Sequence, residues 1–195
     1  MNHSGFIIGL CCMTALAAAS PVQAQTPDAF TAYQHKDYAA AYQGFQQLAA
    51  QGNLNAMNDL GMMYMNGQGV KQDYAAASDW FKKAAEKGHT HAITNLGTLY
   101  EMGQGVTQSY DQAAQLYRIA ANYGVSAAQY NLAALYEAGH GVPKDQMQAY
   151  VWYGLAAQGG SKKAETEKER LRATLDPKLL GPADAYIKTW KPRQS

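Results

Sequence analysis

The chain contains 195 residues, with 16 Lys and Arg against 15 Asp and Glu, so its formal net charge at pH 7 is +1. A charge this small provides no broad positive field, which argues against nucleic-acid binding. The apolar content of 47% argues against disorder and is enough for one soluble domain with a core.

An apolar run near the N-terminus is typical of a secretory signal. Residues 6–19 form a run of 14 residues, FIIGLCCMTALAAA, which is shorter than the roughly 20 that span a bilayer and fits the apolar region of about 7–15 in a signal. Because the small residues Val22-Gln23-Ala24 follow, we predict a signal peptide over residues 1–24, cleaved after Ala24. The mature chain would then lie in the periplasm or be secreted, without stable membrane insertion. No Lys or Arg precedes the run, so a buried N-terminal helix is the alternative.

Three consecutive segments of 36 residues then align without a gap, namely 54–89, 90–125 and 126–161. Small, apolar and aromatic residues recur at equal positions in each segment. The clearest sets are Ala56, Ala92 and Ala128; Leu60, Leu96 and Leu132; Tyr64, Tyr100 and Tyr136; Gly69, Gly105 and Gly141; and Phe81, Tyr117 and Tyr153. A period of this length indicates a stack of similar units that share one elongated core.

Each unit is predicted to contain two helices. Ala56, Leu60 and Tyr64 recur at a spacing of four residues, and a second set at similar spacing begins at Ala77, as expected for one face of a helix. We expect the first helix to end at a glycine in the left-handed conformation and the second to begin at a side chain that accepts hydrogen bonds from its first turn. These glycines are Gly67, Gly103 and Gly139, and these capping residues are Asp73, Ser109 and Asp145.

The flanking segments are predicted to close the two ends of the stack. Tyr38, Phe45 and Gly52 lie 36 residues before Tyr74, Phe81 and Gly88, so residues 25–53 form a degenerate first repeat with a short first helix over about residues 28–35. Residues 162–195 begin a further unit that becomes highly charged, as expected for C-terminal capping helices.

The repeated pattern A-x-x-x-L-G-x-x-Y-x-x-G-x-G-V, followed by A-x-x-W-[FY]-x-x-A-A-x-x-G, resembles the Sel1-like repeat, a relative of the tetratricopeptide repeat. The resemblance implies an all-α fold in which the helix pairs form a right-handed α-α superhelix. It also implies that the chain is an exported bacterial member of the family. Three departures stand out: Ala133 replaces a glycine, Leu116 replaces a tryptophan, and Gly181-Pro182 is expected to interrupt the terminal helix.

Stacked helix pairs curve, so the first helices should line a concave groove in which a peptide or protein segment can lie. The face of these helices that does not carry Leu60 and Tyr64 should project into it. The candidate partner-binding residues are Asn58, Asp59, Met62 and Met65; His91, Thr94, Asn95, Thr98 and Glu101; and Tyr130, Asn131, Ala134 and Glu137. Asp59, Asn95 and Asn131 occupy one equivalent position, where the resemblance implies hydrogen bonds to a ligand backbone or terminus. A plain solvated polar row is the alternative.

The sequence favours no catalytic site, cofactor or metal. It contains no H-E-x-x-H, Walker, S-x-x-K or G-x-S-x-G motif. An envelope hydrolase like the β-lactamase-like activity described for cysteine-rich relatives is an alternative that lacks support, because the mature chain has neither the cysteines nor the serine motif. Met57, Met62, Met63 and Met65 could hold a soft metal such as copper, but such groups more often provide adaptable packing.

Charge is distributed unevenly along the mature chain. Residues 25–161 contain 7 Lys and Arg and 10 Asp and Glu, or −3, whereas residues 162–195 contain 9 and 5, or +4. The basic end is interpreted as a solvated capping face. The sequence therefore predicts a monomeric, non-catalytic, exported scaffold that binds an unidentified protein or peptide and no nucleic acid.

Overall fold

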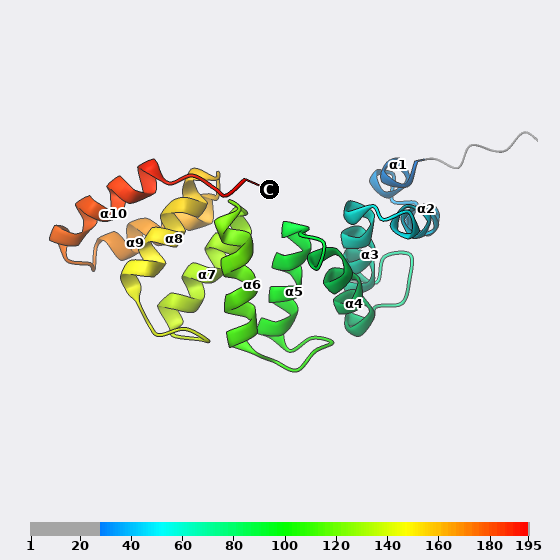
Figure 1. The fold of residues 1–195 in the computed structure, drawn as a ribbon, viewed down its shortest axis with the longest axis horizontal. Coiled ribbons are helices and arrows are strands. Elements are labelled where there is room, and N and C mark those ends of the chain that lie inside the picture. The colour runs from blue at the N-terminus through cyan, green and yellow to red at the C-terminus, as the bar shows by residue number, and fades with distance from the viewer. Residues whose placement is uncertain (1–27, 195) are drawn as a thin grey trace, which may run out of the picture.

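The computed structural model describes residues 28–194, in which all regular secondary structure is α-helical (Figure 1). The predicted signal peptide lies outside the described residues. In the described part of the chain, no helix combines the length and the apolar character needed to cross a membrane. The helices are α1 (Ala29–Gln34), α2 (Tyr38–Ala50), α3 (Leu54–Asn66), α4 (Tyr74–Ala85), α5 (Thr90–Met102), α6 (Tyr110–Asn122), α7 (Ser126–Ala138), α8 (Gln146–Gln158), α9 (Lys162–Arg172) and α10 (Pro177–Thr189).

Each helix from α1 to α9 packs mainly against its neighbours in the chain, and together the helices form the arc seen in Figure 1. The three repeats are the pairs α3 and α4, α5 and α6, and α7 and α8. The pair α1 and α2 corresponds to the predicted degenerate unit before the three repeats, and α9 begins a further unit after them. The prediction of an all-α solenoid of stacked helix pairs is confirmed.

The helix ends lie where the capping pattern predicts them. The carboxylate of Asp73 accepts hydrogen bonds from the backbone N–H groups of Ala75 and Ala76, and Asp145 caps α8 in the same way. Ser109 caps α6 by accepting from the N–H of Gln112. At the other end of the first helices, Gly67, Gly103 and Gly139 have φ values of 67°, 67° and 78°. These left-handed conformations suit glycine, since it has no Cβ to clash.

The second glycine of each turn sets the distance between units. Gly69, Gly105 and Gly141 have φ values of 71°, 67° and 65°. A Cβ on any of them would collide with the backbone at Tyr38, Tyr74 or Tyr110, the first residues of α2, α4 and α6. Each turn therefore lies directly against the start of the second helix in the preceding unit. The valine that follows is buried in the third unit, at Val142, and half-buried in the other two.

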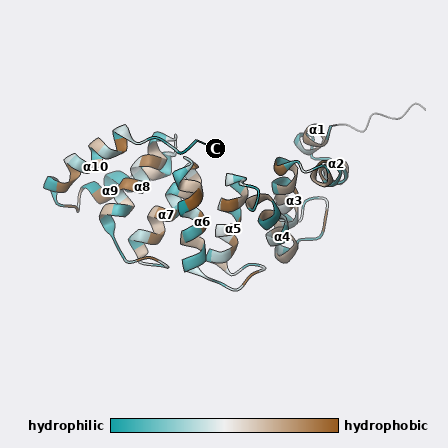
Figure 2. Ribbon diagram, in the orientation of Figure 1, coloured by the Kyte–Doolittle hydropathy of each residue, from teal (hydrophilic) through white to brown (hydrophobic). Residues whose placement is uncertain are grey.

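The core consists largely of small residues against single aromatic rings. Gly61 faces the ring of Phe81, and Gly97 faces the ring of Tyr117, so closely that a Cβ at either glycine would collide with the ring. The third unit has Ala133 at the equivalent position, and this alanine is fully buried in the core. Figure 2 shows that the helices carry both apolar and polar residues, as expected when one side of each is buried.

The prediction that Gly181-Pro182 interrupts the terminal helix is wrong, because α10 runs through both residues. Pro182 removes one backbone N–H and so one hydrogen bond of the helix. Two features compensate for this loss. Asp176 caps the helix start by accepting from the N–H of Lys178, and Ile187 is buried against Gly154 of α8.

The close approach at the turn glycines leads to a prediction about stability. Gly105→Ala should lower the free energy of unfolding by about 2–4 kcal/mol, because it adds a steric clash with Tyr74 to the strain of a positive φ. Gly88→Ala is the matched control. Gly88 has a φ of 87° but no atom within 4 Å of the added Cβ, so only the strain of about 1 kcal/mol applies. Urea-induced unfolding measures both, and equal losses would contradict the spacing role of Gly105.

Candidate functional site

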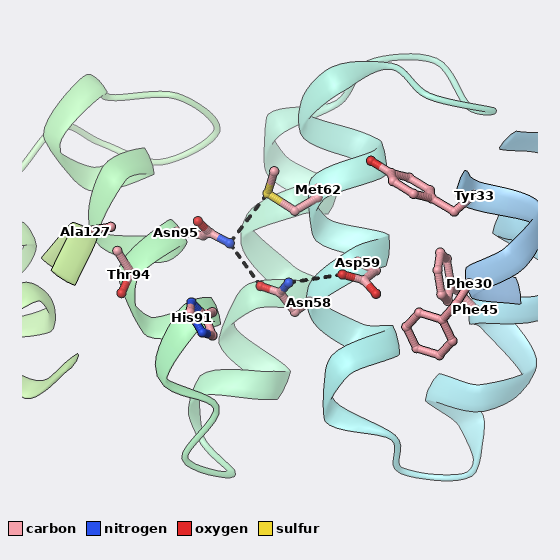
Figure 3. A pocket seen from close by; sticks show the side chains of 10 residues that line it. All are labelled: Phe30, Tyr33, Phe45, Asn58, Asp59, Met62, His91, Thr94, Asn95 and Ala127. Atoms are coloured by element: carbon pink, nitrogen blue, oxygen red, sulfur yellow. Dashed lines mark hydrogen bonds between the residues drawn. The ribbon is translucent and has the colours of Figure 1, made fainter. Parts of the chain in front are cut away.

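A hollow of about 360 Å³ lies on the side of the solenoid formed by the first helices of the units (Figure 3). It is lined by Phe30 and Tyr33 of α1, Phe45 of α2, Asn58, Asp59 and Met62 of α3, His91, Thr94 and Asn95 of α5, and Ala127 of α7. Four successive units thus contribute to one surface. Six of the thirteen predicted partner-binding residues line it, namely Asn58, Asp59, Met62, His91, Thr94 and Asn95.

A chain of side-chain hydrogen bonds crosses the floor of this hollow (Figure 3). The Nδ2 of Asn95 donates to the Oδ1 of Asn58 over 3.0 Å and also contacts the sulfur of Met62 at 3.5 Å. The Nδ2 of Asn58 donates in turn to the Oδ1 of Asp59 over 3.3 Å. These bonds connect α3 to α5 and fix the orientation of the amides. The predicted polar row is therefore an ordered network in its first two units.

Asp59 is a half-buried carboxylate. Burial raises its pKa above the usual value, and the hydrogen bond from Asn58 opposes that effect only in part. Asp59 takes part in none of the ion pairs found among residues 28–194. Its ionised form is therefore destabilised by the folded structure.

An aromatic wall beside Asp59 was not predicted from the sequence. The rings of Phe30 and Phe45 meet edge to face with centroids 5.0 Å apart, and Tyr33 lies 6.1 Å from Phe45. The hydroxyl of Tyr33 donates to the Oε1 of Gln68 over 2.9 Å. Phe30 and Tyr33 are three residues apart on a helix, a spacing that places them on one face. This signal was present, but the segment was interpreted only as a degenerate repeat.

Thr94 lines the hollow but presents little surface to it. Its side chain is only 5% exposed, and its hydroxyl donates to the backbone carbonyl of Thr90 over 3.0 Å. Thr98 is half-buried, with its hydroxyl bonded to the carbonyl of Thr94 and 3.1 Å from the hydroxyl of Tyr117. Both threonines satisfy their polar groups within the fold.

Glu101 and Glu137 hold buried tyrosines of their own repeats. The hydroxyl of Tyr117 donates to Glu101 over 2.6 Å, and that of Tyr153 donates to Glu137 over 3.3 Å. Burial and the nearby carboxylate raise the pKa of Tyr117. In the first unit the equivalent residues are Met65 and Phe81, an apolar pair that needs no such bond. A glutamate therefore occurs in the two repeats that have a buried tyrosine, and is absent from the repeat that has phenylalanine at the same position.

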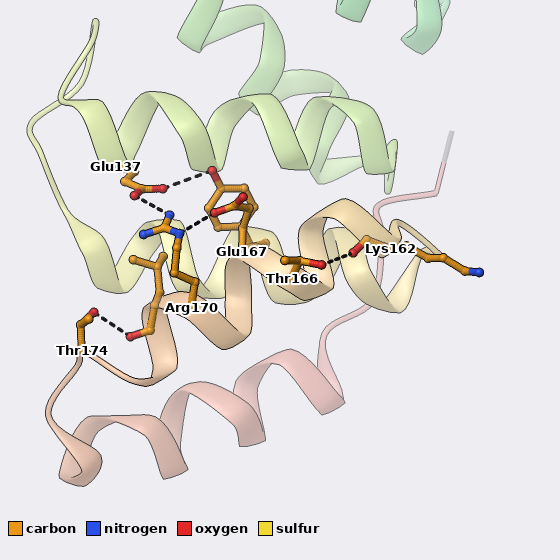
Figure 4. Close-up of polar contacts among 8 residues, drawn as sticks. Glu137, Lys162, Thr166, Glu167, Arg170 and Thr174 are labelled. Atoms are coloured by element: carbon orange, nitrogen blue, oxygen red, sulfur yellow. Dashed lines mark hydrogen bonds and ion pairs between the residues drawn. The ribbon is translucent and has the colours of Figure 1, made fainter.

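Glu137 also belongs to the C-terminal cap (Figure 4). Arg170 of α9 donates to the Oε1 of Glu137 over 2.6 Å and to the Oε2 of Glu167 over 2.7 Å. These carboxylates raise the pKa of the Arg170 guanidinium. The ion pair between Arg170 and Glu137 joins α9 to α7, so Glu137 stabilises the C-terminal end of the stack. Asn131 is half-buried outside the hollow, as is Tyr130, whose ring lies 5.3 Å from that of Tyr153.

The methionines and histidines considered as metal ligands lie in different surroundings. Met57 and Met63 are buried in the core, whereas Met62 faces the hollow. The Nδ1 of His89 accepts from the N–H of Ala92 and so caps α5. Within residues 28–194, no group of three or more His, Cys, Asp or Glu side chains is arranged to hold a metal ion.

The family model of the Sel1 repeat matches residues 54–89, 90–124 and 126–161. A search of curated proteins gave no match.

Among solved structures, the chain is similar to c5321 of uropathogenic Escherichia coli, described as a protective antigen displaying an SLR fold, with a TM-score of 0.67 and 38% identity. It is also similar to a Sel1 repeat protein from Oxalobacter formigenes, with a TM-score of 0.68 and 33% identity. The alignments cover 70% and 72% of this chain, but only 30% and 58% of those two proteins.

The destabilised carboxylate predicts a pH-dependent gain in stability. Asp59→Asn should raise Tm by about 2 °C at pH 7, because it removes a buried charge and keeps the shape of the side chain. A raised pKa means that the folded state binds the proton more readily. The penalty is therefore present above the folded pKa and disappears below the unfolded value of 3.8. Calorimetry of both proteins between pH 7 and about pH 3 measures the difference, and a gain that is equal at both ends would contradict the assignment.

Proposed function

Because the chain belongs to the Sel1-repeat family, whose members are typically non-enzymatic protein-interaction scaffolds, we propose that it binds a segment of a partner protein in the hollow. The observation that supports this is the lining of one hollow by the first helices of four successive units. The protein would act as a monomeric adaptor or regulator in the bacterial envelope.

A polypeptide segment suits this surface better than a small molecule. The hollow extends across α1, α3, α5 and α7, so its ligand lies along the stack and contacts several repeats. An extended chain has backbone N–H and C=O groups that need partners when they are buried. The amides of Asn58 and Asn95 can supply donors and acceptors for them, while Phe30 and Met62 offer apolar contacts.

The surroundings of the hydroxyl groups argue against the alternative of an envelope hydrolase. A nucleophilic hydroxyl needs a base within hydrogen-bond reach. The two hydroxyls that line the hollow, those of Thr94 and Tyr33, donate instead to a backbone carbonyl and to the amide oxygen of Gln68. Neither acceptor is a base that could activate them.

Export is proposed from residues 6–24, whose apolar run and small-residue site match a cleaved signal. Envelope location would place the groove in contact with exported partners.

The charged α9, with salt bridges such as Arg170 to Glu137 and Arg172 to Asp184, closes one end of the stack against solvent.

The groove assignment predicts a selective loss of peptide binding. Random peptides of about 12 residues, which extend to roughly 40 Å, are displayed and selected on the purified chain, and the selected peptides are titrated by calorimetry. Asn95→Ala should weaken their binding by about tenfold, since it removes a hydrogen-bonding amide from the hollow.

Asn131→Ala is the matched control, because Asn131 has the same place in the next repeat but lies outside the hollow. It should leave peptide binding unchanged, and the Tm of each variant checks that the fold is intact. The proposal is wrong if no peptide is selected, or if both variants bind the selected peptides as tightly as the parent chain.

Export makes a separate prediction. When the full chain is expressed in a Gram-negative host, the periplasmic fraction should contain a protein whose N-terminal sequence begins at Gln25. Leu10→Arg should retain the chain in the cytoplasm, because a charge interrupts the apolar run. Recovery of Met1 from the periplasmic protein, or normal export of the variant, would show that residues 1–24 are not a cleaved signal.

A further inference from the structure

The charge of Asp59 is not required by the repeat. Asn95 and Asn131 occupy the equivalent position in the next two units, and an amide has nearly the same shape as a carboxylate. The helices pack in the same order in all three units. A neutral side chain therefore satisfies the fold at this position, so the negative charge in the first unit needs another explanation.

In the described part of the chain, no Lys, Arg or His forms an ion pair with this charge. Asp59 accepts one hydrogen bond, from the Nδ2 of Asn58, and forms none of the ion pairs within residues 28–194. The lining of the hollow contains no Lys or Arg, and His91 is its one imidazole. A half-buried carboxylate in this position loses hydration without gaining an ionic partner, and its raised pKa reflects this loss.

Aromatic rings form the side of the hollow next to Asp59 (Figure 3). Phe30 is 38% exposed although it is a large apolar residue, and its ring packs edge to face on Phe45. Tyr33 completes the wall and keeps its hydroxyl bonded to Gln68. Aromatic faces attract Lys and Arg head groups and also cover their aliphatic stems.

We propose that this hollow is a subsite for a lysine or arginine side chain of the bound segment, with the cationic head paired to Asp59 and the stem against Phe30 and Tyr33. This inference rests on the proposed peptide-binding function and names the chemistry that the groove selects. A volume of about 360 Å³ has room for one long side chain.

Other classes of side chain fit less well. An acidic side chain would be repelled by Asp59 and would find no Lys or Arg in the lining. An aliphatic side chain would cover the rings but would remove the remaining water from an unpaired carboxylate. Residues 25–161 carry 7 Lys and Arg and 10 Asp and Glu, a net charge of −3, which also favours the approach of a basic segment.

Single-residue probes test the subsite directly. Nα-acetyl-lysine methylamide and Nα-acetyl-norleucine methylamide share the aliphatic stem and differ in the charged head. Each is titrated into the isotope-labelled protein, and the shifts of the NMR signals of Asp59 and Phe30 give the affinity. The lysine probe should bind at least about tenfold more tightly than the norleucine probe, as expected for a charge-assisted hydrogen bond.

Two variants that change the charge by one unit, in opposite directions, separate the subsite from general electrostatics. Asp59→Asn should remove the preference for lysine, because it weakens binding of the lysine probe and no longer penalises the norleucine probe for covering a carboxylate. Asn131→Asp adds a carboxylate at the equivalent position outside the hollow and should not change binding of either probe. Equal affinity for the two probes, a preference retained in Asp59→Asn, or no saturable shift with either probe would each overturn the subsite.

The display selection distinguishes this inference from the proposed function. Selected peptides should be enriched in Lys or Arg on the parent chain and should lose that enrichment when Asp59→Asn is used as the bait. Peptides that require Asn95 but show no basic residue would leave the groove intact and overturn the cationic subsite. A selection that yields no peptide contradicts the proposed function, while the single-residue probes still decide whether the subsite exists.

Discussion

The loop inside each repeat rests on the backbone at the start of the second helix in the preceding unit, and this contact leaves no space for a Cβ. Gly69, Gly105 and Gly141 meet this requirement, and their positive φ values direct the chain back along the stack. Since the same contact recurs between successive units, the spacing of the helices is constant. The placement of the first helices along one surface, and the hollow between them, depends on this spacing.

The negative charge and the aromatic lining of the hollow come from residues that are not shared by the repeats. The degenerate first unit supplies Phe30 and Tyr33, and the first full repeat supplies Asp59 where the next two have asparagine. Near the other end of the stack, Glu137 and Tyr130 are occupied by contacts to Arg170 and Tyr153. Repetition thus builds a uniform scaffold, and departures from it concentrate the candidate binding chemistry in the N-terminal half.

Much of the fold could be predicted because it depends on local patterns. The period of 36 residues, the glycine helix ends such as Gly103 and the capping side chains such as Asp73 each act within a few residues of the chain. Helical spacing alone also placed six of the thirteen candidate groove residues in the lining of the hollow. The helix break predicted at Gly181-Pro182 is wrong, because the local preference of proline takes no account of the cap at Asp176 or of the packing of Ile187 against α8.

The sequence by itself determined the repeat, the helix boundaries and the side of each helix that faces the core, since periodicity and capping are properties of neighbouring residues. Only the tertiary structure decided which polar residues remain available to a ligand. The hydroxyl of Thr94 and the carboxylate of Glu101 are bonded within the fold. Asp59 accepts a hydrogen bond from Asn58 but has no ionic partner among residues 28–194, and it lines the hollow with Phe30, an aromatic residue 29 positions earlier in the chain. Burial and pairing depend on contacts between units, and a pattern within one unit carries no information about them.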